Sequence, residues 1–255
     1  MDPVECLKEY ISIRTDHPTP DYEKAITYII HLATQMNLTT QRISLVNNKE
    51  ALLVIKYGTD TALEPIVFNS HIDVVKVDSE MWDLDPWEGQ IKDGKMYGRG
   101  TQDMKSLGIM YLFALNQLIQ EGNLKRTVIL SYVPDEEIMG TEGMFILVQK
   151  LVELFPNIAF ALDEGIPNED DKMTIYYGER ISWWLRLESY GNNGHGSKYI
   201  ENHSINKLQA ALNDIVDIQR SQKELLLNEK ETKSISDVIT INTVLFNKMI
   251  KISRK

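Results

Sequence analysis

Short apolar runs alternate with longer helical patterns along much of the chain, and this alternation is the sequence feature that most constrains the fold. Residues 65–69, 127–133 and 158–162 are apolar enough for buried strands. Helical periodicity occupies residues 103–120 and 143–154 between them. This order predicts an α/β fold with a mostly parallel sheet flanked by helices, in which ligands bind beyond the carboxyl ends of the strands.

Two further helices and two further strands are predicted before this region. Asp2 and Asp21 have side chains suited to cap the first turns of helices. Residues 39–45 and 51–57 have strand character. We expect these elements to complete a first, larger domain over residues 1–178.

The sequence pattern changes beyond Gly178, which indicates a second, smaller α+β domain over residues 179–255. A glycine-rich turn is expected at residues 191–196. The other predicted elements are a strand, a helix and a second strand, around residues 183–184, 208–218 and 238–246.

The charge balance excludes two classes of partner. The chain of 255 residues has 27 Lys and Arg against 37 Asp and Glu, which gives a net charge of −10. A phosphate backbone or an anionic membrane would be repelled, so neither nucleic acid nor a membrane is expected as a partner. The single cysteine, Cys6, cannot form an intrachain disulfide, and the acidic first ten residues do not resemble a secretion signal. A cytoplasmic location is therefore expected.

Each of the three buried-strand candidates is followed by residues that can bind metal ions. These residues are His71 and Asp73 after the first, Asp135, Glu136 and Glu137 after the second, and Asp163 and Glu164 after the third. Because the tips of parallel strands meet at one edge of a sheet, we expect these side chains to share a cleft with Asp103, a predicted helix cap. Close carboxylates repel one another unless a cation lies between them.

Histidine and carboxylate ligands without cysteine favour zinc, manganese or cobalt in a catalytic site. Asp73 is placed to accept the second N–H of the His71 imidazole and so to fix the tautomer that binds metal. Of Glu136 and Glu137, one is expected to bind metal and the other to accept a proton from water. Each group alone is more typical of a solvated turn or a structural histidine, and their coincidence at successive strand ends favours a site. The remaining histidines outside the glycine-rich turn are predicted to be surface or helix residues: His17, His31 and His203.

Five segments resemble, in order and spacing, the co-catalytic zinc amidohydrolases of the M20 metallopeptidase family: NSHIDVV, YGRGTQDMK, VPDEE, LDEG and GNNGHGSK. Three more are similar to enzymes of that family that release L-amino acids from their N-acyl derivatives: PDYEKA, WDLDPWEG and YGERISWWLR. The resemblance extends from about Val4 to Leu245. It implies a zinc peptidase-like catalytic domain followed by part of a lid and dimerisation domain.

The resemblance also implies the metal ligands. Members of the family bind two zinc ions per subunit. His71 and Glu164 match ligands of the first zinc ion, and Glu137 matches a ligand of the second. Asp103 matches the aspartate that bridges both ions.

The resemblance implies three further roles in catalysis. Asp73 matches the residue that orients the histidine ligand. Glu136 matches the general base, which deprotonates the water that attacks the amide carbonyl. His195 matches a lid histidine that reaches the active site of a partner subunit and stabilises the oxyanion.

The predicted function is the zinc-dependent hydrolysis of small N-acyl-L-amino acids to a carboxylate and a free L-amino acid, by a homodimer joined through the lid domain. The family pattern includes one more histidine ligand and further lid residues that have no match in a chain ending at Lys255. One complete zinc site and impaired activity are therefore expected. The alternatives are an M20-type dipeptidase, a noncatalytic truncated product that binds metal or dimerises, and a chain without a stable fold.

Overall fold

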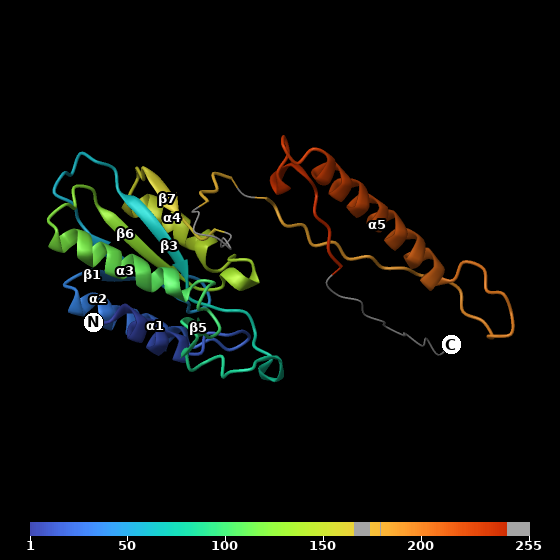
Figure 1. Cartoon of the computed structure of the whole chain (residues 1–255), viewed down its shortest axis with the longest axis horizontal. Coiled ribbons are helices and arrows are strands. Elements are labelled where there is room, and N and C mark those ends of the chain that lie inside the picture. Colours follow the sequence, from blue (N-terminus) through green and yellow to red (C-terminus); the bar gives the residue numbers. More distant parts are fainter. Residues whose placement is uncertain (166–173, 179, 244–255) are drawn as a thin grey trace. The chain divides into compact units, whose positions relative to one another are not determined.

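The computed structural model describes residues 1–165, 174–178 and 180–243 (Figure 1). The chain divides into two compact units, Met1–Ile175 and Tyr176–Lys255. Each unit is described by itself below.

The first unit is built on a five-stranded sheet with the strand order β1-β2-β6-β3-β7 (Figure 1). β3 pairs in parallel with both β6 and β7, whereas β2 runs antiparallel to β1 and to β6. The strands are β1 Thr39–Ser44, β2 Glu50–Lys56, β3 Ile66–His71, β6 Val128–Val133 and β7 Phe160–Leu162. The predicted α/β fold with a mostly parallel central sheet is confirmed, and β2 runs in the direction opposite to the other four strands of this sheet.

Helices cover both faces of this sheet, because its central strands carry apolar side chains on both sides. Leu52 and Val54 of β2 pack with the helices of one face, while Leu53 and Ile55 point to the opposite face. The first face is covered by α1 Pro3–Ser12, α2 Tyr22–Gln35 and α3 Lys105–Gln120, and the second by α4 Met144–Leu154.

Local side-chain chemistry determines where the first two helices begin. The Asp2 carboxylate accepts a hydrogen bond from the Val4 N–H at 2.9 Å, and the Asp21 carboxylate accepts one from the Lys24 N–H at 3.1 Å. Both predicted caps are confirmed. The predicted cap of α3 is wrong: that helix has Met104 at its N-cap position, without a side-chain hydrogen bond.

Short elements connect the larger ones. A two-stranded antiparallel sheet, β4 Gln90–Lys92 with β5 Lys95–Tyr97, lies before α3. Single 3₁₀ turns form at η1 Ser79–Met81 and η2 Glu136–Ile138. Only η2 bears on the site, because it carries both predicted glutamates.

The described part of the second unit contains one long helix, α5 Ser204–Asn228, and the 3₁₀ turn η3 Ile235–Asp237. The predicted helix is confirmed, but the predicted strand at Trp183 and Trp184 is wrong, because the residues there form no strand. These side chains are 81% and 71% exposed, so among the described residues of this unit no packing partner supports their strand propensity. The second predicted strand is also absent from residues 238–243, and its remaining residues, 244–246, lie outside the described part.

Within the described residues, no helix is long and apolar enough to cross a bilayer.

Candidate metal centre

The parallel register of β3 and β6 brings two of the predicted segments together. His71, the last residue of β3, lies opposite Val133, the last residue of β6. The next N–H, of Ile72, donates to the carbonyl of Val133 at 2.9 Å. Asp73 and the turn η2 therefore emerge side by side at the carboxyl edge of the sheet.

The His71 side chain is buried, and its Nε2 atom faces three carboxylates. Nε2 lies 2.8 Å from Oδ1 of Asp103, 3.5 Å from Oε2 of Glu164 and 3.9 Å from Oε2 of Glu136. The other nitrogen, Nδ1, lies 2.9 Å from the main-chain oxygen of Asp73. Because a carbonyl oxygen only accepts, Nδ1 carries a proton and Nε2 is the nitrogen available to a metal ion.

Two overlapping groups of side chains have the spacing of a metal site. They are His71 with Asp103 and Glu137, and His71 with Glu136 and Glu164, and within each group the ligand atoms lie within 4.8 Å of one another. The structure thus brings together five of the residues selected from the sequence. Three further carboxylates were expected in this cleft. Asp73 lies beside the cluster and accepts hydrogen bonds from the N–H groups of Glu136 and Glu137, whereas Asp135 and Asp163 belong to neither group, and Asp163 instead accepts a hydrogen bond from Asn69 at 3.0 Å.

His195 belongs to the second unit, so its position relative to the cluster is not described. Its exposed imidazole Nδ1 lies 2.8 Å from the Ser197 hydroxyl. Its role at the active site of a partner subunit stays a prediction.

The cluster has an electric field suited to a cation. Burial by itself would lower the pKa of His71, but hydrogen bonds with Asp103, Asp73 and Glu164 raise this pKa to about 12. Burial raises the pKa of Glu137 to about 7, and the charges of Asp103 and Glu136 act in the same direction. The carboxylates therefore repel one another and stabilise positive charge among them. A divalent cation fits this donor set of one imidazole and several carboxylates.

The Asp73 carboxylate is fully buried and organises the residues around it. Its Oδ1 accepts the N–H of Glu136 and its Oδ2 accepts the N–H of Glu137, each at 3.0 Å. Oδ1 lies 3.5 Å from Nδ1 of His71, which makes its shorter contact with the main-chain oxygen of Asp73. Asp73 thus connects the histidine to the turn that carries both glutamates.

His17 is a member of this arrangement that sequence reasoning missed. Its Nε2 donates to Oδ2 of Asp73 at 2.9 Å, and its side chain is only 16% exposed. The prediction of a surface or helix residue is wrong for His17, which lies in the connection between α1 and α2. No local signal marks it, because its partner is 56 positions away in the sequence. His31 lies exposed on α2, as predicted.

Hydrogen bonds to Asp135, the residue before the turn η2, also stabilise this turn. Asp135, which precedes the turn, is buried and adopts a left-handed backbone conformation with φ of 67°. Its carboxylate accepts a hydrogen bond from the Tyr22 hydroxyl at 2.7 Å and one from Lys49. The Lys49 ammonium also donates to Glu142 at 2.6 Å. These contacts stabilise a conformation that is unfavourable for a residue with a side chain.

Gly143, which follows the turn η2 and precedes α4, lies very close to the backbone of Pro134. A Cβ atom added to Gly143 would lie 1.9 Å from the carbonyl oxygen of Pro134, an impossible contact between a methyl group and rigid backbone. Gly143→Ala is expected to destabilise the protein by roughly 1–3 kcal/mol, since an overpacked site must shift its backbone. Urea unfolding measures this change. Gly178→Ala is the control, because nothing lies within 4 Å of a Cβ there; equal stability of the two variants would contradict the prediction.

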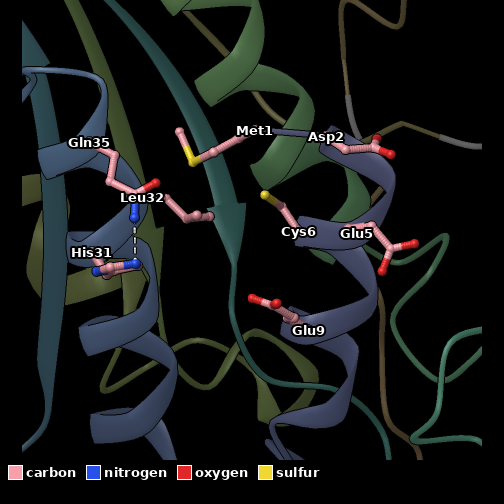
Figure 2. A pocket seen from close by; sticks show the side chains of 8 residues that line it. All are labelled: Met1, Asp2, Glu5, Cys6, Glu9, His31, Leu32 and Gln35. Atoms are coloured by element: carbon pink, nitrogen blue, oxygen red, sulfur yellow. Dashed lines mark hydrogen bonds between the residues drawn. The ribbon is translucent and has the colours of Figure 1, made fainter.

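A pocket of about 280 Å³ lies elsewhere, between the N-terminal segment with α1 and the end of α2 (Figure 2). Carboxylates of Asp2, Glu5 and Glu9 line one wall, and His31 and Gln35 line the other. His31 and Gln35 hydrogen-bond to each other at 2.6 Å. None of the predicted metal ligands lines this pocket, so it is separate from the cluster.

A sheet edge with one buried histidine and four converging carboxylates is the arrangement expected of a metal-binding α/β protein, and comparison with known families specifies which class it is. The model of peptidase family M20/M25/M40 matches residues 67–241. The chain belongs to this family. The match begins in β3 and includes every residue of the cluster.

The curated relatives of this chain include several proteins named aminoacylase-1. The one from Sus scrofa is 40% identical over 225 residues, which are 88% of this chain and 55% of the relative. The one from Dictyostelium discoideum is 37% identical over 250 residues, which are 95% of this chain and 60% of the relative. The chain therefore spans little more than half the length of these relatives.

Solved structures show the same fold at lower identity. An M20 family metallo-carboxypeptidase, Sso-CP2 from Sulfolobus solfataricus, is 21% identical with a TM-score of 0.57, over 65% of this chain and 38% of that one. Human carnosine dipeptidase 1 is 19% identical with a TM-score of 0.52, over 63% and 37% of the two chains. At this identity the similarity concerns the fold alone.

Proposed function

We propose that this chain carries the metal-binding part of an amidohydrolase that cleaves N-acyl-L-amino acids into a carboxylate and a free L-amino acid. The observation that carries the proposal is the convergence of Asp103, Glu136 and Glu164 on Nε2 of His71. The relatives named aminoacylase-1 support the substrate class.

We propose that His71, Asp103 and Glu164 hold a zinc ion. When bound, zinc would act as a Lewis acid on the amide carbonyl and lower the pKa of water. Both candidate ligand groups include His71, and one imidazole nitrogen binds one ion. This overlap supports one firmly held zinc ion per chain. A second, weaker site would use Glu137, with Asp103 between the two.

Glu136 is the proposed general base. Its pKa is raised, first by burial and then by the neighbouring Glu164 and Asp73 carboxylates, which outweigh the opposing charge of His71. A carboxylate with a raised pKa is a better proton acceptor than an ordinary glutamate. In the proposed reaction Glu136 takes a proton from the attacking water and delivers it to the nitrogen of the leaving amino acid.

The proposed assembly is a cytoplasmic homodimer. The match of the segment around His195 to a lid that acts on a partner subunit supports the dimer, and the single, buried Cys6 is in keeping with a reducing compartment. Size-exclusion chromatography with light scattering tests the dimer. A strictly monomeric chain, alone and when coexpressed with a full-length relative, would contradict it.

Hydrolysis assays on the purified 255-residue chain test the function. N-acetyl-L-methionine is expected to be cleaved faster than any member of a dipeptide panel, and a chelator is expected to stop cleavage until zinc is added. Cleavage of dipeptides alone would establish the alternative of an M20-type dipeptidase. Metal binding without any turnover would establish the alternative of a noncatalytic product, and a melt without a cooperative transition would show that the chain has no stable fold.

A further inference from the structure

We infer that His17 is a positioning residue for the metal centre, and that it acts through the Asp73 carboxylate. This inference rests on the metal site of the proposed function. Nε2 of His17 donates to Oδ2 of Asp73 at 2.9 Å. The remaining contacts of that carboxylate lead to the candidate ligands and to the proposed base.

The backbone holds His17 in place beside Asp73. The connection between α1 and α2 forms a parallel bridge between Asp16 and Val74. The N–H of Val74 donates to the carbonyl of Thr15 at 3.1 Å. The segment directly before His17 is therefore hydrogen-bonded to Val74, the residue after Asp73. This backbone pairing fixes the position of His17.

A buried lysine anchors the same connection from the other side. Nζ of Lys105 donates to the carbonyl oxygens of Tyr10 and Ile13, at 3.1 and 2.7 Å. These carbonyls lie at the end of α1, and Lys105 is the first residue of α3. The segment that leads to His17 is thus attached to the helix that begins directly after the loop of Asp103.

Each Asp73 oxygen has a distinct set of partners. Oδ1 accepts the N–H of Glu136 and lies 3.5 Å from His71, whereas Oδ2 accepts the N–H of Glu137 and the imidazole N–H of His17. Without His17, Oδ2 of this fully buried carboxylate would keep only the hydrogen bond from the N–H of Glu137. An under-solvated buried charge either rotates or attracts water. Either response would shift the main-chain oxygen and carboxylate that orient His71, together with the turn η2.

The expected consequence is a weaker metal site. Groups that hydrogen-bond to metal-binding residues typically contribute 10–100-fold to metal affinity. His17→Leu removes the donor while retaining a similar volume. Because His17 acts on the ligands only through Asp73, the substitution is expected to lower the affinity for Co²⁺ and Zn²⁺ by about 10-fold, the lower end of that range. His17→Gln keeps an amide N–H near the position of Nε2 and is expected to restore most of that affinity, whereas His17→Asn is too short to do so.

The experiment titrates the full chain with Co²⁺ and follows its visible absorption, with zinc competition to obtain the zinc affinity. His31→Leu and His31→Gln are matched controls on an exposed histidine of α2, and both are expected to bind as tightly as the unsubstituted chain. Thermal melts establish that each variant folds. The comparison of His17→Gln with His17→Asn keeps the test decisive if His17→Leu fails to fold.

Wild-type affinity in His17→Leu, or equal affinities in His17→Gln and His17→Asn, would overturn the inference. These outcomes differ from a failure of the proposed function. An unsubstituted chain that binds neither metal overturns both, because no site then exists to position. An unsubstituted chain that binds metal but cleaves no amide overturns the proposed function alone, and the cobalt titration still decides the role of His17.

Discussion

Glu136→Gln is expected to lower kcat/KM for N-acetyl-L-methionine by about 10²–10⁴-fold, the usual contribution of a general base. Glutamine has the shape of glutamate but cannot take a proton from water at neutral pH. The side chain is not among the three proposed zinc ligands, so the zinc content is expected to stay unchanged. Initial rates and metal analysis on the same preparation measure both quantities.

The neighbouring substitution Glu137→Gln distinguishes the loss of a general base from the loss of a metal ligand. Both glutamates belong to a candidate group, but only Glu137 is proposed as a ligand, at the second and weaker site, so its loss is expected to weaken metal binding as well as turnover. Glu153→Gln, an exposed side chain on α4, is the isosteric control and is expected to retain full activity. A Glu136→Gln enzyme with normal turnover, or one that loses its zinc, would contradict the assignment of the base.

The cluster could be predicted from sequence because its members follow strands. His71 comes at the end of β3, and Glu136 and Glu137 follow β6, so a parallel pairing suffices to bring them together. Asp103 shows the limit of that reasoning. Aspartate before a helix is a good cap, but here its carboxylate lies 2.8 Å from the buried imidazole and leaves the helix uncapped. A hydrogen bond to a residue 32 positions away in the sequence overrides a local propensity there.

His17 could not be predicted for a different physical reason. Its place depends on the pairing of the α1–α2 connection with the segment after β3, a contact between backbone groups far apart in sequence. Backbone hydrogen bonds of this kind leave no pattern of hydrophobic period or residue type. Trp183 and Trp184 show the converse, since their strand propensity is strong but no strand pairs with them in the part of the chain that the structure describes.

The largest expected loss of metal binding follows from His71→Ala. The unsubstituted 255-residue chain is expected to retain one zinc ion after dialysis, because the two ligand groups share this imidazole. Removing the only nitrogen ligand of both groups is expected to lower zinc affinity by more than about 100-fold, the upper range for groups that merely support a ligand. Isothermal titration with zinc measures the affinity, and elemental analysis measures the content.

Two outcomes of that experiment would contradict the proposed centre in different ways. Two tightly held zinc ions per unsubstituted chain would refute the single strong site, because a second ion would need ligands beyond the shared His71 groups. Stoichiometric zinc in His71→Ala would refute the cluster itself. His31→Ala makes the same substitution at an exposed histidine of α2 and is expected to leave zinc binding unchanged. A loss limited to His71→Ala would therefore be due to the missing Nε2 ligand among these carboxylates, and not to the loss of any imidazole on the protein.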